Sequence, residues 1–203
     1  MFRLIPVTLL AFSVLLIRIS PAPAAKFNKI VDIGDKPVAW KDLEGVDGKT
    51  HSLSDYKDAE VLVIAFTCNH CPVANAYEAR FNEFAGAYKD KKVQFVAISV
   101  SDSDVDSLEN MTERAKEKGY KFDYLQDLSQ ETARAYGALV TPHLYVLDRD
   151  RKIAYMGAFD NSMNPAKVEK HYVKDAVDAL LKGKEPEVKE SLQFGCGIQY
   201  KRK

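Results

Sequence analysis

The sequence lacks an excess of charge of either sign, a second cysteine pair, internal repeats and low-complexity segments. Its 29 basic and 29 acidic residues balance, so composition gives no electrostatic argument for a nucleic-acid partner. Three cysteines are present, and only one CxxC motif occurs, with no HxxxH motif beside it. A zinc site usually needs a second ligand pair, so the shortage argues against a structural zinc centre.

A long hydrophobic run is also missing. The apolar stretch from Leu4 to Ile17 is shorter than the roughly 18 residues that indicate a spanning helix, and Arg18 closes it. Arg3 precedes this stretch, and Ala22-Pro23-Ala24 follows it in the A-x-A pattern of a cleavage site. We therefore predict a signal peptide over residues 1–24 and a secreted or periplasmic protein, with membrane association only if the segment is retained as an anchor. Disulfides can persist in such a compartment.

Strands and helices alternate along the remaining chain. The apolar run at 61–66 predicts a strand buried on both faces, and a helix is expected from Pro72 to Tyr88. The same patterns predict strands at 93–100, 122–125, 143–148 and 152–159, helices at 108–119, 130–136 and 168–182, and a hairpin around Asp47-Gly48. This order favours an α/β fold with a mixed central sheet flanked by helices and an N-terminal β-hairpin. We expect one domain over residues 25–203, with a cysteine-containing tail from about residue 184.

The segment "VLVIAFTCNHCPV" carries the chemistry. Cys68 follows the buried strand and Cys71 lies at the start of a helix, where unpaired N–H groups stabilise a thiolate. The spacing lets Cys68 attack a disulfide and Cys71 resolve the mixed disulfide. A protonated His70 between them would lower the pKa of Cys68 further. A purely structural disulfide would add little stability, because closing so short a loop removes little entropy from the unfolded chain. Two thiolates with a histidine remain suitable for copper(I).

The segments "FTCNHCPVANAYEARF", "VAISVSD", "GALVTP" and "GCGIQYK" carry a family resemblance. The sequence resembles the thioredoxin fold and, more narrowly, a peroxiredoxin-like branch of the redoxin (AhpC/TSA) family, over about residues 35–201. The resemblance implies that Pro142 is a cis-proline that packs against the cysteine pair. It also implies that the backbone of Thr141 holds a substrate cysteine in extended form.

Three further features lie outside this motif. Cys196, between two glycines, could be a distant resolving partner for Cys68, a link between chains, a free thiol or a residue packed against the domain. The acidic segment "SDSDVD" lacks the glycine and terminal glutamate of a calcium loop, and we interpret it as helix-capping residues. His143, next to Pro142, is expected on the exposed face of a strand.

The prediction is an extracytoplasmic thiol-disulfide oxidoreductase with catalytic Cys68, Cys71 and His70 and a substrate platform of Thr141 and Pro142. The expected partners are protein dithiols or disulfides. No organic cofactor or metal is expected, because the electrons pass to or from another dithiol protein. One alternative is a thiol peroxidase that uses Cys196 to resolve. The peroxiredoxin pattern PxxxTxxC is not met, since alignment on Cys71 places Ile64 on the proline. The other alternative is a copper-handling protein that binds the metal through Cys68, Cys71 and a nearby histidine.

Overall fold

The computed structural model describes residues 25–202, so the predicted signal segment at 1–24 lies outside the described residues. A seven-stranded sheet has the order β2-β1-β5-β4-β3-β7-β8. Its strands are β1 (Leu43–Gly45), β2 (Thr50–His51), β3 (Val61–Thr67), β4 (Val93–Ser99), β5 (Asp123–Gln126), β7 (His143–Leu147) and β8 (Ile153–Gly157). Strands β3, β4 and β5 are parallel, and the other pairings are antiparallel. The predicted mixed sheet and N-terminal hairpin are confirmed.

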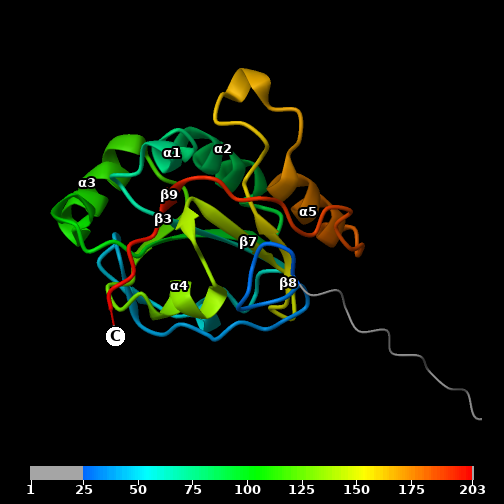
Figure 1. Ribbon diagram of the computed structural model, residues 1–203, viewed down its shortest axis with the longest axis horizontal. Helices are drawn as coiled ribbons and strands as arrows, with labels where there is room; N and C mark the ends of the chain where they lie inside the picture. Colours follow the sequence, from blue (N-terminus) through cyan, green and yellow to red (C-terminus); the bar gives the residue numbers. More distant parts are fainter. Residues whose placement is uncertain (1–24, 203) are drawn as a thin grey trace, which may run out of the picture.

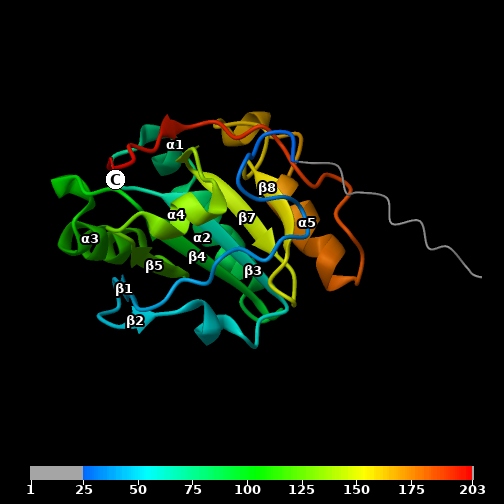
Figure 2. The ribbon, with the colours of Figure 1, turned by 60° about the horizontal axis from the view of Figure 1, so that its bottom comes forward.

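Helices cover both faces of the sheet (Figures 1 and 2). One face carries α1 (Pro72–Asn75), α2 (Glu78–Tyr88), α3 (Leu108–Lys118) and α5 (Tyr172–Leu181), and the other carries α4 (Glu131–Tyr136) with the segment that precedes β1. Short 3-10 helices form at η1 (Leu53–Tyr56), η2 (Asp104–Asp106) and η3 (Pro165–Lys167). Among residues 25–202, no helix combines the length and the apolar composition needed to cross a bilayer.

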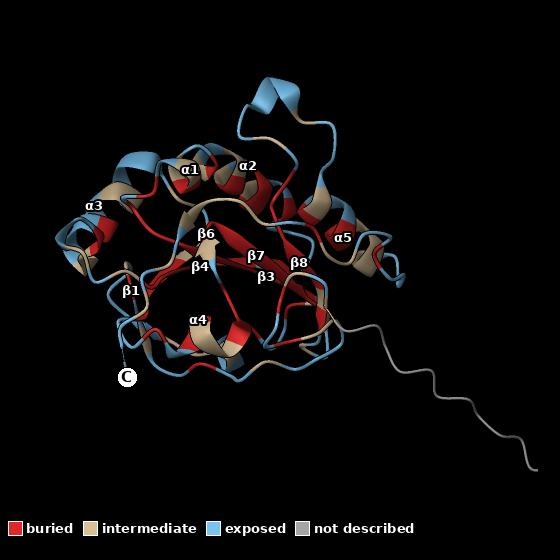
Figure 3. Ribbon diagram, viewed as in Figure 1, coloured by how far each residue is buried: buried red, intermediate tan, exposed pale blue. Residues whose placement is uncertain are grey.

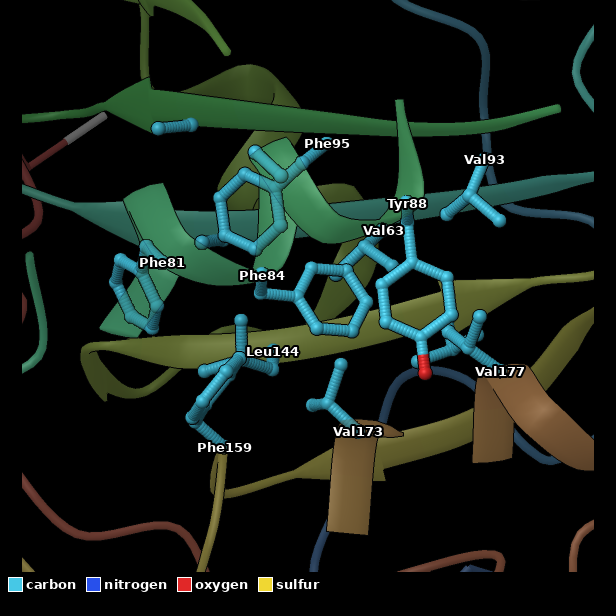
Figure 4. Packing of buried hydrophobic residues seen from close by; sticks show 14 of the residues in the cluster. Val63, Phe81, Phe84, Tyr88, Val93, Phe95, Leu144, Phe159, Val173 and Val177 are labelled. Carbon is cyan, nitrogen blue, oxygen red and sulfur yellow. The ribbon is translucent and has the colours of Figure 1, made fainter. Parts of the chain in front are cut away.

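Strand β3 forms the centre of the core, and all seven of its residues are buried, as Figure 3 shows for the middle of the sheet. Alternate side chains of a strand point to opposite faces. Val61, Val63 and Ala65 therefore join the cluster under α2 and α5, while Leu62, Ile64 and Phe66 join the cluster under α4. Figure 4 shows the first cluster, in which aromatic side chains from α2 meet valines from α5. An apolar run without alternation is thus what a strand between two helical layers requires.

Two predicted helices differ from the structure. The helix expected over 72–88 is divided into α1 and α2, because the Tyr77 N–H bonds to the Ala74 carbonyl in a tighter turn. The helix expected from 168 begins four residues later, at Tyr172. The side chain of Asn161 accepts hydrogen bonds from the backbone N–H groups of Glu169 and Lys170, at 2.9 and 3.0 Å, and so holds them outside the helix.

A second, two-stranded sheet was not predicted. It pairs β6 (Val140–Thr141) with β9 (Cys196–Gly197) in antiparallel register. The C-terminal segment therefore does not extend away from the domain. In both ribbon views the red segment that contains β9 runs beside α1 (Figures 1 and 2).

Candidate functional site

The sheet topology brings distant residues to one edge. Strands β3 and β4 are parallel, so the segments after them, which contain Cys68 and Asp106, leave the sheet on the same side. Strand β7 is antiparallel to β3, with His143 opposite Phe66, so the Thr141-Pro142 segment before β7 lies at this edge too. The carboxyl ends of parallel strands are where α/β proteins commonly bind ligands.

The two cysteines bracket Thr141. The Cys68 sulfur lies 3.5 Å from the Thr141 hydroxyl, and the Cys71 sulfur lies 3.0 Å from the Thr141 carbonyl oxygen. Cys68 is 4% exposed and Cys71 is fully buried. The Thr141–Pro142 peptide bond is cis, as the family resemblance predicts. The predicted pair and the predicted platform residues therefore occupy one site.

The helix N-terminus acts on Cys71 rather than on Cys68. Cys71 is the N-cap residue of α1, and its sulfur accepts the Ala74 N–H at 3.4 Å. Hydrogen bonds from Cys68, Cys196, the Thr141 side chain and the Ala74 N–H lower the pKa of Cys71 to about 4. Burial acts in the opposite direction, and so does the Thr141 carbonyl oxygen, which accepts the Cys71 thiol at 3.0 Å and favours its protonated form.

The expectation that Cys68 is the low-pKa thiol is therefore corrected. Its hydrogen bond to Cys71, followed by burial, raises the pKa of Cys68 above the ordinary value of 9. The physical reason is position in the chain: Cys68 lies four residues before the first helical residue, Pro72, so no N–H group of α1 reaches its sulfur. The two thiols titrate as a coupled pair, and the directions of their pKa shifts favour Cys71 as the one that loses its proton first.

His70 connects Cys68 to a buried carboxylate. The His70 Nε2 atom lies 3.8 Å from the Cys68 sulfur, while its Nδ1 atom contacts Asp106. Asp106 is fully buried, whereas the His70 side chain is 48% exposed. A carboxylate on Nδ1 fixes the ring with Nε2 directed at the sulfur, which is the arrangement of a cysteine, a base and an orienting acid.

Sequence reasoning missed Asp106. Besides the His70 ring, this carboxylate accepts the backbone N–H groups of Asn69 and His70, so it holds the loop between the two cysteines. The interpretation of "SDSDVD" as capping residues is confirmed only for the neighbouring Ser107, which caps α3. The available signal was an acidic residue soon after a strand expected to run parallel to β3.

Strand β9 pairs with the backbone of Thr141, the segment that the family resemblance predicts to hold a substrate. Thr141 pairs with Cys196, and Val140 pairs with Gly197. The Cys196 thiol is half-buried and packs against the cysteine pair, where it hydrogen-bonds to Cys71. Among the alternatives left open for Cys196, the structure favours packing at the site, with Cys71 rather than Cys68 as the adjacent sulfur.

A cavity of about 180 Å³ opens beside the site. Cys68, His70 and Thr141 line one side, and the loop after β4 with the tail residue Gln199 lines the other. Cys71 does not reach the cavity. A small reactant can therefore approach Cys68 while Cys71 stays covered.

A metal has few free ligands here. Cys68, His70 and Asp106 each offer an atom, and these atoms lie within 4.8 Å of one another. Both oxygens of Asp106 are already engaged by the His70 ring and by backbone N–H groups. The set that remains consists of the two sulfurs and His70 Nε2, which are soft ligands that suit copper(I) better than magnesium or calcium.

His143 is not on the exposed face of the sheet, which corrects the expectation. It is 2% exposed, and its Nδ1 atom accepts the Leu139 N–H at 3.3 Å. Burial lowers the pKa of His143 to about 3. The side chain belongs to the cluster on the α4 face, next to Tyr145, and not to the sulfur site.

His143 gives the fold an acid sensitivity. Because its folded pKa lies below the unfolded value of about 6.5, the unfolded chain binds the proton better, and stability that is complete above pH 6.5 is lost as the pH falls. We expect His143→Gln to remove about 2 kcal/mol of the stability difference between pH 7 and pH 5, measured by urea unfolding. The exposed His171, changed to Gln, is the control. Equal pH dependence in wild type and His143→Gln would contradict this role.

The profile of the AhpC/TSA family matches residues 33–156. Thiol-disulfide oxidoreductase ResA from Bacillus thuringiensis subsp. konkukian is 26% identical over 108 residues, which are 53% of this chain and 60% of that protein, so the chain spans less than two thirds of the relative.

Solved structures extend the similarity to nearly the whole chain. An uncharacterized conserved protein from Geobacillus kaustophilus is 38% identical, with a TM-score of 0.80, and the match covers 90% of this chain and 98% of that one. A putative thiol:disulfide interchange protein DsbE from Chlorobium tepidum superimposes with a TM-score of 0.62 at 23% identity, over 74% of this chain and 99% of that one. The second match confirms the thioredoxin-like fold.

Proposed function

This chain belongs to the AhpC/TSA family, and on that premise we propose that it is a thiol-disulfide oxidoreductase whose Cys68 and Cys71 alternate between dithiol and disulfide. The observation that carries the proposal is the contact of both sulfurs with Thr141, at 3.5 Å for Cys68 and 3.0 Å for Cys71. A stabilised thiolate beside a second thiol is the requirement for disulfide exchange.

Cys68 is the attacking residue in this proposal, because it borders the cavity and Cys71 does not. Its proton moves to His70 Nε2 as the Cys68 sulfur attacks a disulfide R–S–S–R, and RS⁻ leaves. Cys71, which remains a thiolate, then attacks the Cys68 sulfur, and the second R group leaves as thiolate. The protein ends as the Cys68–Cys71 disulfide, and the substrate disulfide has gained the two electrons. Asp106 acts as a positioning residue by holding the His70 ring.

The compartment and the partners belong to the proposal too. The apolar N-terminal segment supports an extracytoplasmic location, where protein disulfides form and persist. The partners that fit an exchanging dithiol are protein dithiols and disulfides, and the dithiol itself carries the electrons. No organic cofactor is required for this chemistry.

The test is a thiol-exchange assay, the reduction of a disulfide peptide in the presence of dithiothreitol. We expect Cys68→Ser to lower the turnover at least about 1,000-fold, because no other described thiol borders the cavity and removal of a nucleophile leaves little residual catalysis. The variant Met163→Ser, which changes an exposed side chain away from the site, is the control. Unchanged turnover in Cys68→Ser would end the proposal.

Copper binding is the second candidate, because Cys68 and His70 belong to one cluster of possible ligands and the sulfur of Cys71 packs beside Cys68. Metal analysis after anaerobic purification separates the two functions. One equivalent of tightly held copper together with slow thiol exchange would favour the metal-handling function. The geometry gives less support to peroxide reduction, because no arginine lines the cavity to polarise a peroxide. Peroxide consumption at the rate of free cysteine would exclude it.

A further inference from the structure

The C-terminal segment is held in place by contacts that position one sulfur. Ile198 donates its N–H to the Leu139 carbonyl at 3.0 Å, and the Tyr200 hydroxyl donates to the Ala138 carbonyl at 2.7 Å. On the other side of β9, Phe194 packs against Tyr77, with ring centroids 6.1 Å apart. These anchors on both sides of Cys196 fix its backbone beside Thr141.

Gly195 allows the approach that this position needs. A Cβ atom at Gly195 would lie 2.1 Å from the Thr141 carbonyl oxygen, a distance that real side chains do not adopt. A Cβ atom at Gly197, two residues later, would meet nothing within 4 Å. The backbone therefore passes directly against the residue that both other cysteines contact.

Cys71 lies between two thiols as a result. The three cysteines pack together, and Cys68 and Cys196 both contribute to the lowered pKa of Cys71. Among the three sulfurs, that of Cys71 is fully buried and that of Cys68 nearly so, whereas Cys196 is half-buried. Resting on the proposed function above, we propose that Cys196 is a third catalytic thiol, which accepts the disulfide from the Cys68–Cys71 pair and presents it to a dithiol protein as a Cys71–Cys196 disulfide.

The step conserves atoms and electrons. The Cys196 thiolate attacks the Cys71 sulfur of the Cys68–Cys71 disulfide, the Cys71–Cys196 bond forms, and Cys68 leaves as a thiolate that takes up the proton released by Cys196. No net oxidation occurs within the protein. A partner dithiol then attacks the Cys196 sulfur, and Cys71 leaves as a thiolate. A second exchange releases the partner as a disulfide and leaves all three cysteines reduced.

The low pKa of Cys71 suits it to this central position. A thiol of low pKa leaves faster in disulfide exchange. Cys71 is the leaving group when a partner attacks Cys196 and also when a partner attacks Cys68. The transfer moves the reactive disulfide from the cavity, which admits small reactants, to the half-buried tail, where a protein can reach it.

The test equilibrates the full-length protein with mixtures of reduced and oxidised glutathione, blocks free thiols with iodoacetamide and maps disulfides by mass spectrometry. We expect Cys68→Ser to form an intramolecular Cys71–Cys196 disulfide. The matched variant Cys71→Ser is expected to form none, because Cys71 is the sulfur that contacts both others. If Cys68→Ser carries only glutathione adducts under conditions that oxidise the wild type, the relay is overturned.

A second pair of variants keeps all three cysteines. Gly195→Ala is expected to lower the yield of the Cys71–Cys196 disulfide about tenfold and to retain the Cys68–Cys71 disulfide, whereas Gly197→Ala should match the wild type. Equal yields in both variants would contradict the relay. A protein that forms only Cys68–Cys71 and exchanges normally would refute the relay alone. A protein that forms no disulfide and shows no exchange would refute the proposed function itself.

Discussion

Replacing Cys71 with serine is expected to remove both the thiol exchange and the thiolate of the reduced protein. The hydrogen bonds to this sulfur lower the pKa of Cys71, so we expect Cys71 to carry one negative charge at neutral pH. Serine cannot ionise in this range and cannot form a disulfide, so turnover should fall at least about 1,000-fold. The Cys68→Ser variant loses turnover too, but its serine hydroxyl still donates to Cys71, so its thiolate should remain.

Ultraviolet absorbance at the thiolate band separates the two sulfurs. Between pH 6 and 9, the reduced wild type and the Cys68→Ser and Cys196→Ser variants should each show about one thiolate, and Cys71→Ser should lack it, because the pKa of Cys71 is lowered to about 4 while that of Cys68 is raised. The opposite pattern, with the band lost in Cys68→Ser and kept in Cys71→Ser, would show that the charge rests on Cys68.

Asp106→Asn is expected to slow exchange about 10–100-fold, the usual effect of removing a carboxylate that orients a functional histidine. The amide that replaces the carboxylate presents an N–H group to His70 Nδ1, which favours the tautomer with the proton on Nε2. In that tautomer Nε2 cannot accept the proton of Cys68. The negative charge of Asp106 also raises the pKa of Cys68. Its removal should therefore lower that pKa, and the rising limb of the pH–rate profile, along which Cys68 loses its proton, should move to lower pH.

The pH–rate profile distinguishes a role of Asp106 in positioning His70 from a role in stabilising the loop alone. A variant that only loosens the loop would lose activity equally at every pH. Asp104→Asn is the matched control, because Asp104 lies in the same short helix with its side chain exposed. Loss of activity in Asp104→Asn as large as in Asp106→Asn, or an unshifted profile in Asp106→Asn, would contradict the role of the carboxylate.

The parts of the fold that depend on local pattern could be predicted from the sequence. The run of apolar residues in β3 reports burial on both faces, and Pro72 and Gly119 mark where α1 begins and α3 ends. The cysteine pair was placed correctly because strand and helix follow one another directly in the chain. The expectation that the helix N-terminus acts on Cys68 was wrong, because Cys71, three residues later, is the N-cap residue of α1.

The parts that depend on distant pairing could not be predicted. Asp106 reaches His70 only because β3 and β4 are adjacent and parallel. Cys196 reaches Cys71 only because a two-residue strand pairs with β6, and a strand of that length leaves no periodic signal in the sequence. The burial of His143 follows from its register opposite Phe66, which no single segment reveals.

The brevity of β9 has a consequence for how the molecule moves. Because β9 has only two residues, its detachment breaks few backbone hydrogen bonds. The pairing of β9 with β6 can therefore open locally while the central sheet stays intact. The edge before Pro142 faces solvent only in molecules in which β9 and its anchors at Ile198 and Tyr200 have detached. An extended polypeptide can pair with that edge only in this form, so its apparent affinity is reduced by the fraction of molecules that are open, whereas a reactant small enough for the cavity escapes this penalty.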